Sequence, residues 1–135
     1  AGRGVDGNRY PWGDSPAVSC THAVVQEDGA QGCGTYAVME VGTKLLGISP
    51  YGALDMIGNI SEWTSDWFDA TIYATTPEGG WVNPTGPETG TQKMVRGGSW
   101  DYGMAMDLKL TKRDFSEQPH VKTAYRGFRC AKDAS

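Results

Sequence analysis

Glycine occupies 19 of the 135 positions, about twice the usual share in a globular chain. Leucine, which most helical bundles depend on, occurs only five times. Glycine weakens helices and strands but permits the left-handed backbone of tight turns. We therefore expect one irregular, loop-rich α+β domain over residues 1–135, because this length suits a single domain. Tryptophan and tyrosine, with five and six copies, are expected to fill much of its core.

The formal net charge of −4 is unevenly distributed along the chain. Residues 1–92 carry three basic and eleven acidic side chains, whereas residues 93–135 carry nine basic and five acidic ones. This asymmetry predicts that the two parts attract each other within one fold. A pI near 5.0 argues against a nucleic acid partner, because such a partner needs a basic surface. No run of about 18 apolar residues occurs, so no membrane span is expected.

The apolar pattern predicts short strands separated by long turns. Residues 60–68 alternate as a strand would, although the spacing of Trp63 and Trp67 also fits a helix. Residues 51–56 fit either one helical turn or a tight loop. Residues 45–48 are a brief apolar run, and 69–92 and 115–123 read as loops. Further strands are expected at 35–41, 93–100, 106–113 and 124–132, with Phe128 facing the interior and Trp12 packing into the core.

Three cysteines constrain the compartment and the loops. Cys20 and Cys33 lie in a glycine-rich stretch, and a disulfide between them would stabilise the fold by roughly 3 kcal/mol. The alternative is two free thiols. Cys130 is left over, which indicates either a partner elsewhere or a buried thiol. The chain starts at Ala1 rather than methionine, which a removed leader or a trimmed chain would explain.

The stretch from Tyr51 to Asp66 combines acidic residues with a Gly58-Asn59 pair that suits a tight, left-handed turn. Such a turn points backbone carbonyls inward, and Asp55 and Glu62 can add carboxylate oxygens. Carboxylates and carbonyls from one segment suit calcium better than zinc or copper. The alternative is a plain turn with two solvated acids. Asn59-Ile60-Ser61 is formally a glycosylation sequon, but a buried turn would make it a chance match.

Five motifs in order carry a family resemblance. They are YPWGD at 10–14, YGALDMIGNISEWTSDW at 51–67, NPTGP at 83–87, VRGGSW at 95–100 and GFRCA at 127–131. Together they resemble the C-terminal half of the formylglycine-generating enzyme family, also called the sulfatase-modifying-factor domain. The resemblance implies a C-type-lectin-like fold with short antiparallel strands. It also implies that the N-terminal half is missing, and we expect that half on a separate or cleaved chain, with a cysteine that would pair with Cys130. The alternative is a compact, truncated variant of the fold.

The enzymes of that family oxidise a substrate cysteine with copper held by two cysteines shortly after the RGGS motif. The matching positions here are Tyr102 and Asp107, and soft Cu(I) needs thiolate ligands. A serine, Ser61, also stands where the family usually has an aromatic residue. Ser99 matches a family active-site position, but it has no metal partner. The resemblance therefore predicts that copper chemistry is absent. His22 and His120 alone would be too few for an iron or zinc site.

The calcium prediction agrees better with the resemblance. One family calcium site uses positions that match Asp55 and Glu62 through their side chains, and Gly58 and Ile60 through their carbonyls. Asp55 replaces the more usual asparagine, which adds charge and should strengthen binding. The expected role of calcium is structural, because it would neutralise the carboxylates and fix the turn.

Two functions remain open at this point. The first is a non-catalytic, calcium-stabilised binding or scaffold module in a larger extracytoplasmic assembly: periplasmic, cell-surface or secreted. Its partner would be a protein or the missing half, with a glycan as another candidate ligand. The expected ligand surface comprises Ser99, Trp100, Tyr102, Met104, Asp107, Phe115 and His120. The second is a metal-dependent oxidoreductase of the same superfamily whose catalytic ligands lie in the missing half.

Overall fold

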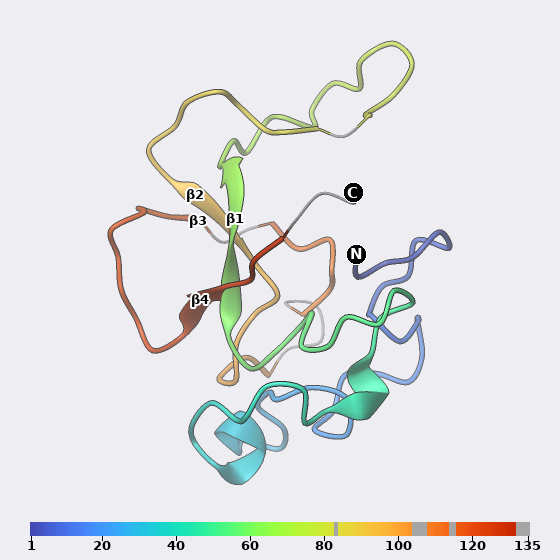
Figure 1. Cartoon of the computed structure of the whole chain (residues 1–135), viewed down its shortest axis with the longest axis vertical. Coiled ribbons are helices and arrows are strands. Elements are labelled where there is room, and N and C mark those ends of the chain that lie inside the picture. The colour runs from blue at the N-terminus through green and yellow to red at the C-terminus, as the bar shows by residue number, and fades with distance from the viewer. Residues whose placement is uncertain (83, 104–107, 114–115, 132–135) are drawn as a thin grey trace.

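The computed structural model describes residues 1–82, 84–103, 108–113 and 116–131. Short elements are separated by long irregular segments, as the glycine content predicts (Figure 1). Two 3₁₀ helices, η1 (Gln31–Gly34) and η2 (Leu45–Gly47), precede four strands. The strands are β1 (Ser61–Trp67), β2 (Lys93–Arg96), β3 (Ser116–Glu117) and β4 (Arg126–Phe128). The loop-rich fold class predicted from the sequence is confirmed.

The four strands form one sheet in the order β3-β2-β1-β4. The β1–β2 pair is antiparallel and places Trp63 opposite Val95, with an irregularity before Trp67 pairs with Lys93. The β2–β3 pair is also antiparallel. β4 instead runs parallel to β1, with Glu62 opposite Gly127 and Trp63 opposite Phe128. The C-terminal motif therefore lies directly beside the central strand (Figure 1).

The core is smaller and more aliphatic than the composition suggests. Its main cluster comprises Tyr10, Ala23, Val25, Ile57 and Leu108, with Trp12 and Tyr102 among the partly buried residues packed against it. The largest fully buried side chains include Met94, Leu108, Val24 and Val25. Tyr36 and Tyr51, by contrast, are exposed. The packing of Trp12 agrees with the prediction, but the prediction that aromatic residues fill much of the core is only partly right.

Two predicted strands are absent because other contacts use their backbone. Residues 35–41 form turns, and Tyr36 has a φ of 55°, which a strand does not permit. In the second segment, residues 108–113 also form turns. Leu110 donates its N–H to the carbonyl of Arg9, and Lys112 donates to Lys109. The apolar alternation at Leu108 and Leu110 therefore reflects two separate packing contacts rather than a pleated strand.

The remaining strand predictions are right in place but wrong in extent. Residues 60–68 form β1, 93–100 shorten to β2 because the chain turns at Gly97, and 124–132 shorten to β4. Residues 51–56 are a loop, and 45–48 contain η2. The predicted loop at 115–123 contains β3. Phe128 is 76% exposed rather than interior, because β4 is an edge strand and the described segments leave its end at Phe128 uncovered.

Cys20 and Cys33 form the predicted disulfide, with their Cα atoms 5.6 Å apart. The bond ties η1 to the segment that enters the core at Ala23 and Val25. Cys130 is exposed and is not in a disulfide within the described residues. No helix in the described ranges has the length and apolar character needed to cross a membrane.

Candidate functional site

The segment 55–59 forms the tight turn predicted from the sequence. Asp55, Gly58 and Asn59 have φ angles of 53°, 75° and 59°. The Gly58 N–H donates to the Gly97 carbonyl, and the Asn59 N–H donates to the Val24 carbonyl. A Cβ at position 58 would lie 2.6 Å from the Val24 carbonyl oxygen, which explains the glycine. The turn therefore connects the N-terminal core with the start of the VRGGSW loop.

Asn59 binds the backbone of Met39, twenty residues earlier in the chain, to this turn. Its Oδ1 accepts a hydrogen bond from the Met39 N–H at 2.9 Å, and its Nδ2 donates to the Met39 carbonyl at 3.1 Å. The residue is only 3% exposed. Because both ends of the amide are paired and buried, Asn59 cannot accept a glycan, which agrees with the chance-match interpretation of the sequon. Sequence reasoning did not identify this pairing role.

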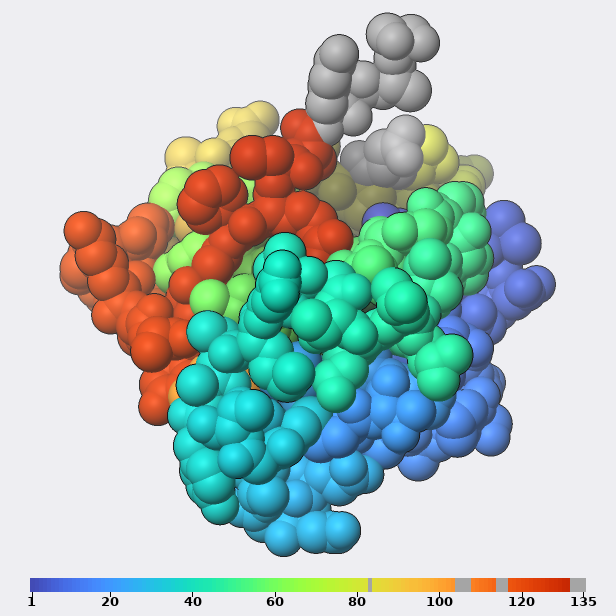
Figure 2. All heavy atoms as spheres, turned by 60° about the horizontal axis from the view of Figure 1, so that its bottom comes forward, coloured from blue at the N-terminus to red at the C-terminus, as the bar shows by residue number. Residues whose placement is uncertain are grey.

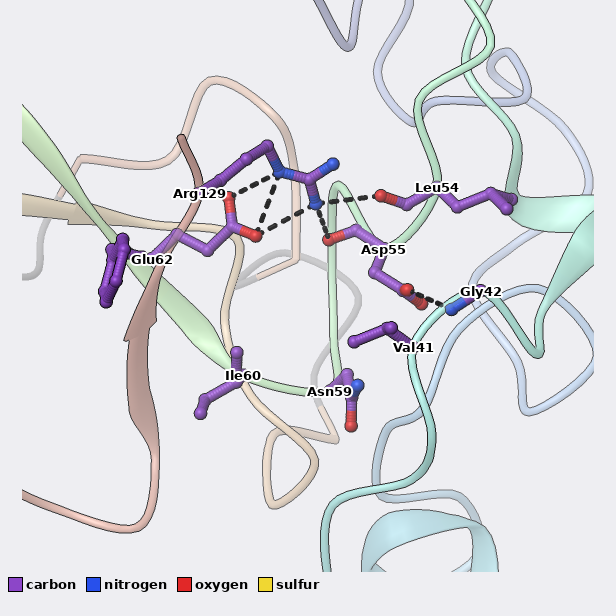
Figure 3. Close-up of a pocket in the computed structure, with 9 residues that line it drawn as sticks. Val41, Gly42, Leu54, Asp55, Asn59, Ile60, Glu62 and Arg129 are labelled. Carbon is purple, nitrogen blue, oxygen red and sulfur yellow. Dashed lines mark hydrogen bonds and ion pairs between the residues drawn. The ribbon is translucent and has the colours of Figure 1, made fainter. Parts of the chain in front are cut away.

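Arg129 makes the densest set of polar contacts at the site (Figure 3). Its Nε donates to both carboxylate oxygens of Glu62, at 3.1 and 3.2 Å, and its Nη2 donates to Oε1 at 2.9 Å. The same Nη2 donates to the carbonyls of Leu54 and Asp55, at 2.8 and 3.2 Å. The hydrogen bonds that Arg129 donates to the Glu62 carboxylate raise the pKa of Arg129 above its ordinary value. Sequence reasoning missed this residue, although it lies in the quoted GFRCA motif.

The predicted calcium ligands lie near one another, but their carboxylates face different partners. Asp55 Oδ2 accepts the Gly42 N–H at 2.6 Å, while both oxygens of Glu62 face Arg129. In Figure 3 the Asp55 side chain points towards Gly42 and away from Glu62. In this arrangement the two carboxylates do not fit a calcium ion. The Glu62 oxygens already accept hydrogen bonds from the Arg129 guanidinium, and Asp55 Oδ2 accepts one from the Gly42 amide. Calcium binding stays a prediction that would require Arg129 to move.

A pocket of about 360 Å³ lies beside this contact. Of the predicted calcium ligands, Asp55, Ile60 and Glu62 line it, and Val41 and Phe128 form its apolar side. Figure 2 shows the C-terminal segment in red beside the teal-to-green segment that includes residues 36–55. The site therefore joins β1, β4 and the loop 36–55.

Large apolar side chains remain exposed at that pocket and along the chain segment that leads to it. We call this group the apolar face; its members are Tyr36, Val38, Val41, Leu45, Leu46, Ile48, Tyr51 and Phe128, all large hydrophobic residues that remain exposed. Val41 is 77% exposed and Phe128 76%, although both line the pocket. Exposed apolar side chains beside a pocket are typical of an interaction site. Sequence reasoning missed it, because residues 35–41 were expected to form a strand and Phe128 to face the interior.

The residues of the predicted ligand surface differ in exposure, and ligand binding by them stays a prediction. Ser99 is 0% exposed and its hydroxyl contacts the Asp101 carboxylate, so its inclusion in a surface is wrong. Its burial follows from the turn that folds back at Gly97 and Gly98. Trp100 is partly buried and its ring centroid lies 5.3 Å from that of Tyr125, while Tyr102 packs against the core. His120 is exposed. Met104, Asp107 and Phe115 lie outside the described residues.

Tyr102, the first of the two positions that match copper cysteines, is therefore a packing residue, and Asp107 lies outside the described part. Within the described ranges, no three His, Cys, Asp or Glu side chains form a group that could hold a metal. Calcium binding through two carboxylates and backbone carbonyls stays a prediction.

The comparison with protein families decides the assignment. The model of the sulfatase-modifying factor enzyme 1-like domain matches residues 1–134. This chain belongs to that family. It is similar to the formylglycine-generating enzyme of Thermomonospora curvata, with 31% identity over 96% of the chain, and to that of Streptomyces coelicolor, with 32% over 97%. The chain covers 45% and 42% of these relatives, which is less than half of their length.

Other similar proteins have different names. The serine/threonine-protein kinase Pkn1 of Chlamydia trachomatis is 32% identical over 98% of this chain, which covers 19% of the kinase. Treponema denticola variable protein 1 superposes with a TM-score of 0.61 and 28% identity, covering 80% of this chain and 34% of that one. PvdO from Pseudomonas aeruginosa superposes with a TM-score of 0.68 at 19% identity, covering 94% and 46%. The last likeness supports the fold alone.

Proposed function

We propose that this chain is a non-catalytic binding or scaffold module that works by docking another polypeptide onto the apolar face. The observation that carries the proposal is the exposure of Phe128 and Val41 beside a formed pocket. Leaving such side chains in water forgoes the free energy that their burial would supply, roughly 2 kcal/mol for each large apolar side chain. A partner that covers the apolar face would recover it.

The edge of the sheet gives the partner a second attachment. β4 lies at the end of the strand order, and no described strand pairs with its outer edge. Exposed strand edges recruit additional strands through backbone hydrogen bonds. Because the chain spans less than half of its formylglycine-generating relatives, the partner that fits best is the rest of such a domain. It would add a strand to β4 and place apolar side chains over Phe128.

The disulfide supports an extracytoplasmic location for this module, since such bonds persist in oxidising compartments. Calcium is not needed for the proposed docking. A glycan is a secondary candidate ligand.

A second candidate is an oxidoreductase whose metal ligands come from the partner half. The similarity to formylglycine-generating enzymes over nearly the whole chain favours it. Tyr102 opposes it, because a phenol cannot replace the thiolate that Cu(I) requires. Metal analysis of the purified complex distinguishes the candidates: stoichiometric copper or iron supports the enzyme, and a complex without redox metal supports the scaffold.

Docking can be tested with a defined probe. The probe is the part of the Streptomyces coelicolor enzyme that this chain does not cover, purified as a separate polypeptide and mixed with the chain. Sedimentation velocity should show a one-to-one complex, and amide hydrogen exchange of β4 should slow on binding.

The variants Phe128→Asp and Val41→Asp should weaken the complex at least about tenfold, since they place a charge in the interface. Val82→Asp is the matched control, because Val82 is 80% exposed and lies outside the apolar face. A complex that tolerates Phe128→Asp and Val41→Asp as well as Val82→Asp, or the absence of any complex, would contradict docking at this surface.

A further inference from the structure

We propose that Arg129 fastens the 54–62 segment without metal, because its guanidinium holds the carboxylate of Glu62, one of the ligands that the family resemblance assigns to calcium. The inference rests on the geometry around Glu62 and is independent of the proposed docking. It assigns a role to a residue that sequence reasoning overlooked.

The first argument is the identity of the acceptors. Arg129 donates hydrogen bonds to both carboxylate oxygens of Glu62 and to the carbonyls of Leu54 and Asp55. Carboxylate and carbonyl oxygens from one loop are the ligand set that calcium prefers. A guanidinium uses the same oxygens as hydrogen-bond acceptors, and its planar fork holds a carboxylate through two of its nitrogens. A divalent cation at these oxygens would meet the positive charge of Arg129 at close range.

The second argument is how the sheet places Arg129. In the parallel β1–β4 pair, Glu62 lies opposite Gly127. Residues two apart on a strand lie on the same face, so Arg129 follows Gly127 on the face of Glu62. Gly127 has no side chain, and a Cβ there would lie 3.2 Å from Ile60. The glycine therefore lets Ile60 pack closely against β4, beside the Glu62–Arg129 contact.

The third argument concerns the other acid of the predicted calcium site. Asp55 has its carboxylate on the Gly42 N–H at 2.6 Å and its carbonyl on Arg129. The Asp55 side chain thus binds the segment that carries Val41, while the Asp55 backbone carbonyl accepts a hydrogen bond from the Arg129 guanidinium. The Asp55 carboxylate therefore binds Gly42, and the Glu62 carboxylate binds Arg129. These two contacts join the loop 36–55, the turn at 55–59 and the residue that follows β4.

The experiment compares thermal unfolding in excess calcium chloride and in excess EDTA. The unchanged chain should have the same midpoint in both. Arg129→Met should lower the midpoint by roughly 5 °C or more in EDTA. It should also gain a calcium-dependent recovery, because Glu62 and the two carbonyls become free. Adding Glu62→Gln to Arg129→Met should abolish that recovery. Lys122→Met is the control for loss of one exposed positive charge and should leave the midpoint nearly unchanged.

The proposal is overturned if EDTA lowers the midpoint of the unchanged chain and calcium restores it. It is also overturned if Arg129→Met behaves like Lys122→Met, or if Arg129→Met gains no response to calcium. Should Arg129→Met fail to fold in either solution, Arg129→Lys provides the second measurement. The lysine keeps the positive charge but lacks the planar guanidinium. Its unfolding midpoint should lie between those of the unchanged chain and Arg129→Met, and calcium should not change it. A calcium-responsive Arg129→Lys variant would count against the proposal.

Discussion

At the scale of single residues, the site depends on backbone conformations that few side chains tolerate. Asp55, Gly58 and Asn59 all have positive φ, and Asn59 uses its amide to clamp Met39. Asparagine and aspartate enter the left-handed region more easily than most residues, whereas Gly58 is also enclosed by neighbouring atoms. The positive φ angles therefore restrict which residues can occupy positions 55, 58 and 59, and the neighbouring atoms further restrict the side chain at position 58.

The variant Gly58→Ala should lower the free energy of unfolding by about 2–4 kcal/mol, measured by urea titration, because strain at positive φ adds to a backbone clash. Its new Cβ would lie 2.6 Å from the Val24 carbonyl oxygen. Gly79→Ala is the matched control: its φ is 84°, but no atom lies within 4 Å of the added Cβ. That variant should cost only about 1 kcal/mol. Equal losses in the two variants would contradict the role of the clash.

Asp69 gives a pH-dependent prediction at the same scale. The Thr71 N–H and then the Thr71 hydroxyl donate to its carboxylate and lower the pKa of Asp69 below its ordinary value of 3.8. Because the folded value is the lower one, this turn contributes stability above pH 3.8 and loses it as the pH falls through the folded value. Thr71→Val removes the hydroxyl and keeps the N–H, so an NMR titration should show a partial rise in the pKa of Asp69. An unchanged titration would show that the hydroxyl bond is not formed in solution.

At the scale of elements, β2 and β4 differ in what covers them. Met94 in β2 is 1% exposed within the sheet, whereas Phe128 in the edge strand β4 is 76% exposed. The two strands flank the same central strand, β1. The position at the sheet edge leaves Phe128 uncovered, although the Arg126 side chain of the same strand is only 7% exposed.

In the isolated chain, Met94→Ala should lower the free energy of unfolding by about 2–5 kcal/mol through the cavity that it leaves. Phe128→Ser should change it by about 0.5 kcal/mol or less, since an exposed side chain loses few contacts. Chemical denaturation of both variants provides the measurement. A large loss for Phe128→Ser would mean that Phe128 is covered within the chain itself, and it would remove the main support for docking at the apolar face.

At the scale of the whole molecule, opposite charges meet between the acidic first part and the basic last part. Arg129 pairs with Glu62, Arg113 donates to the Asp69 carbonyl, and Lys93 donates to the Ser65 carbonyl. Each basic group comes from residues 93–135 and each acceptor from residues 1–92. Of these three contacts, the Arg129–Glu62 pair joins opposite charges of the two parts, and the other two bind neutral backbone carbonyls in or just after β1.

Raising sodium chloride from low ionic strength to about 0.5 M should lower the free energy of unfolding by about 1 kcal/mol or less, because these contacts are partly exposed and are screened by salt. The Glu62–Arg129 pair, with side chains 23% and 39% exposed, should account for part of this loss. The salt dependence should accordingly be smaller in Arg129→Met. Stability that rises with sodium chloride would contradict a net attraction between the two parts.

The sequence determined the family, the loop-rich fold, the 58–59 turn and the Cys20–Cys33 bond. These depend on local backbone chemistry or on motifs in order, and both are readable without coordinates. Only the tertiary structure decided that Phe128 faces outward, that Ser99 is buried and that Arg129 binds Glu62. The reason is physical: exposure and pairing depend on which strand lies beside β1. The parallel placement of β4, formed by residues more than sixty positions away, is a long-range contact that no local pattern encodes.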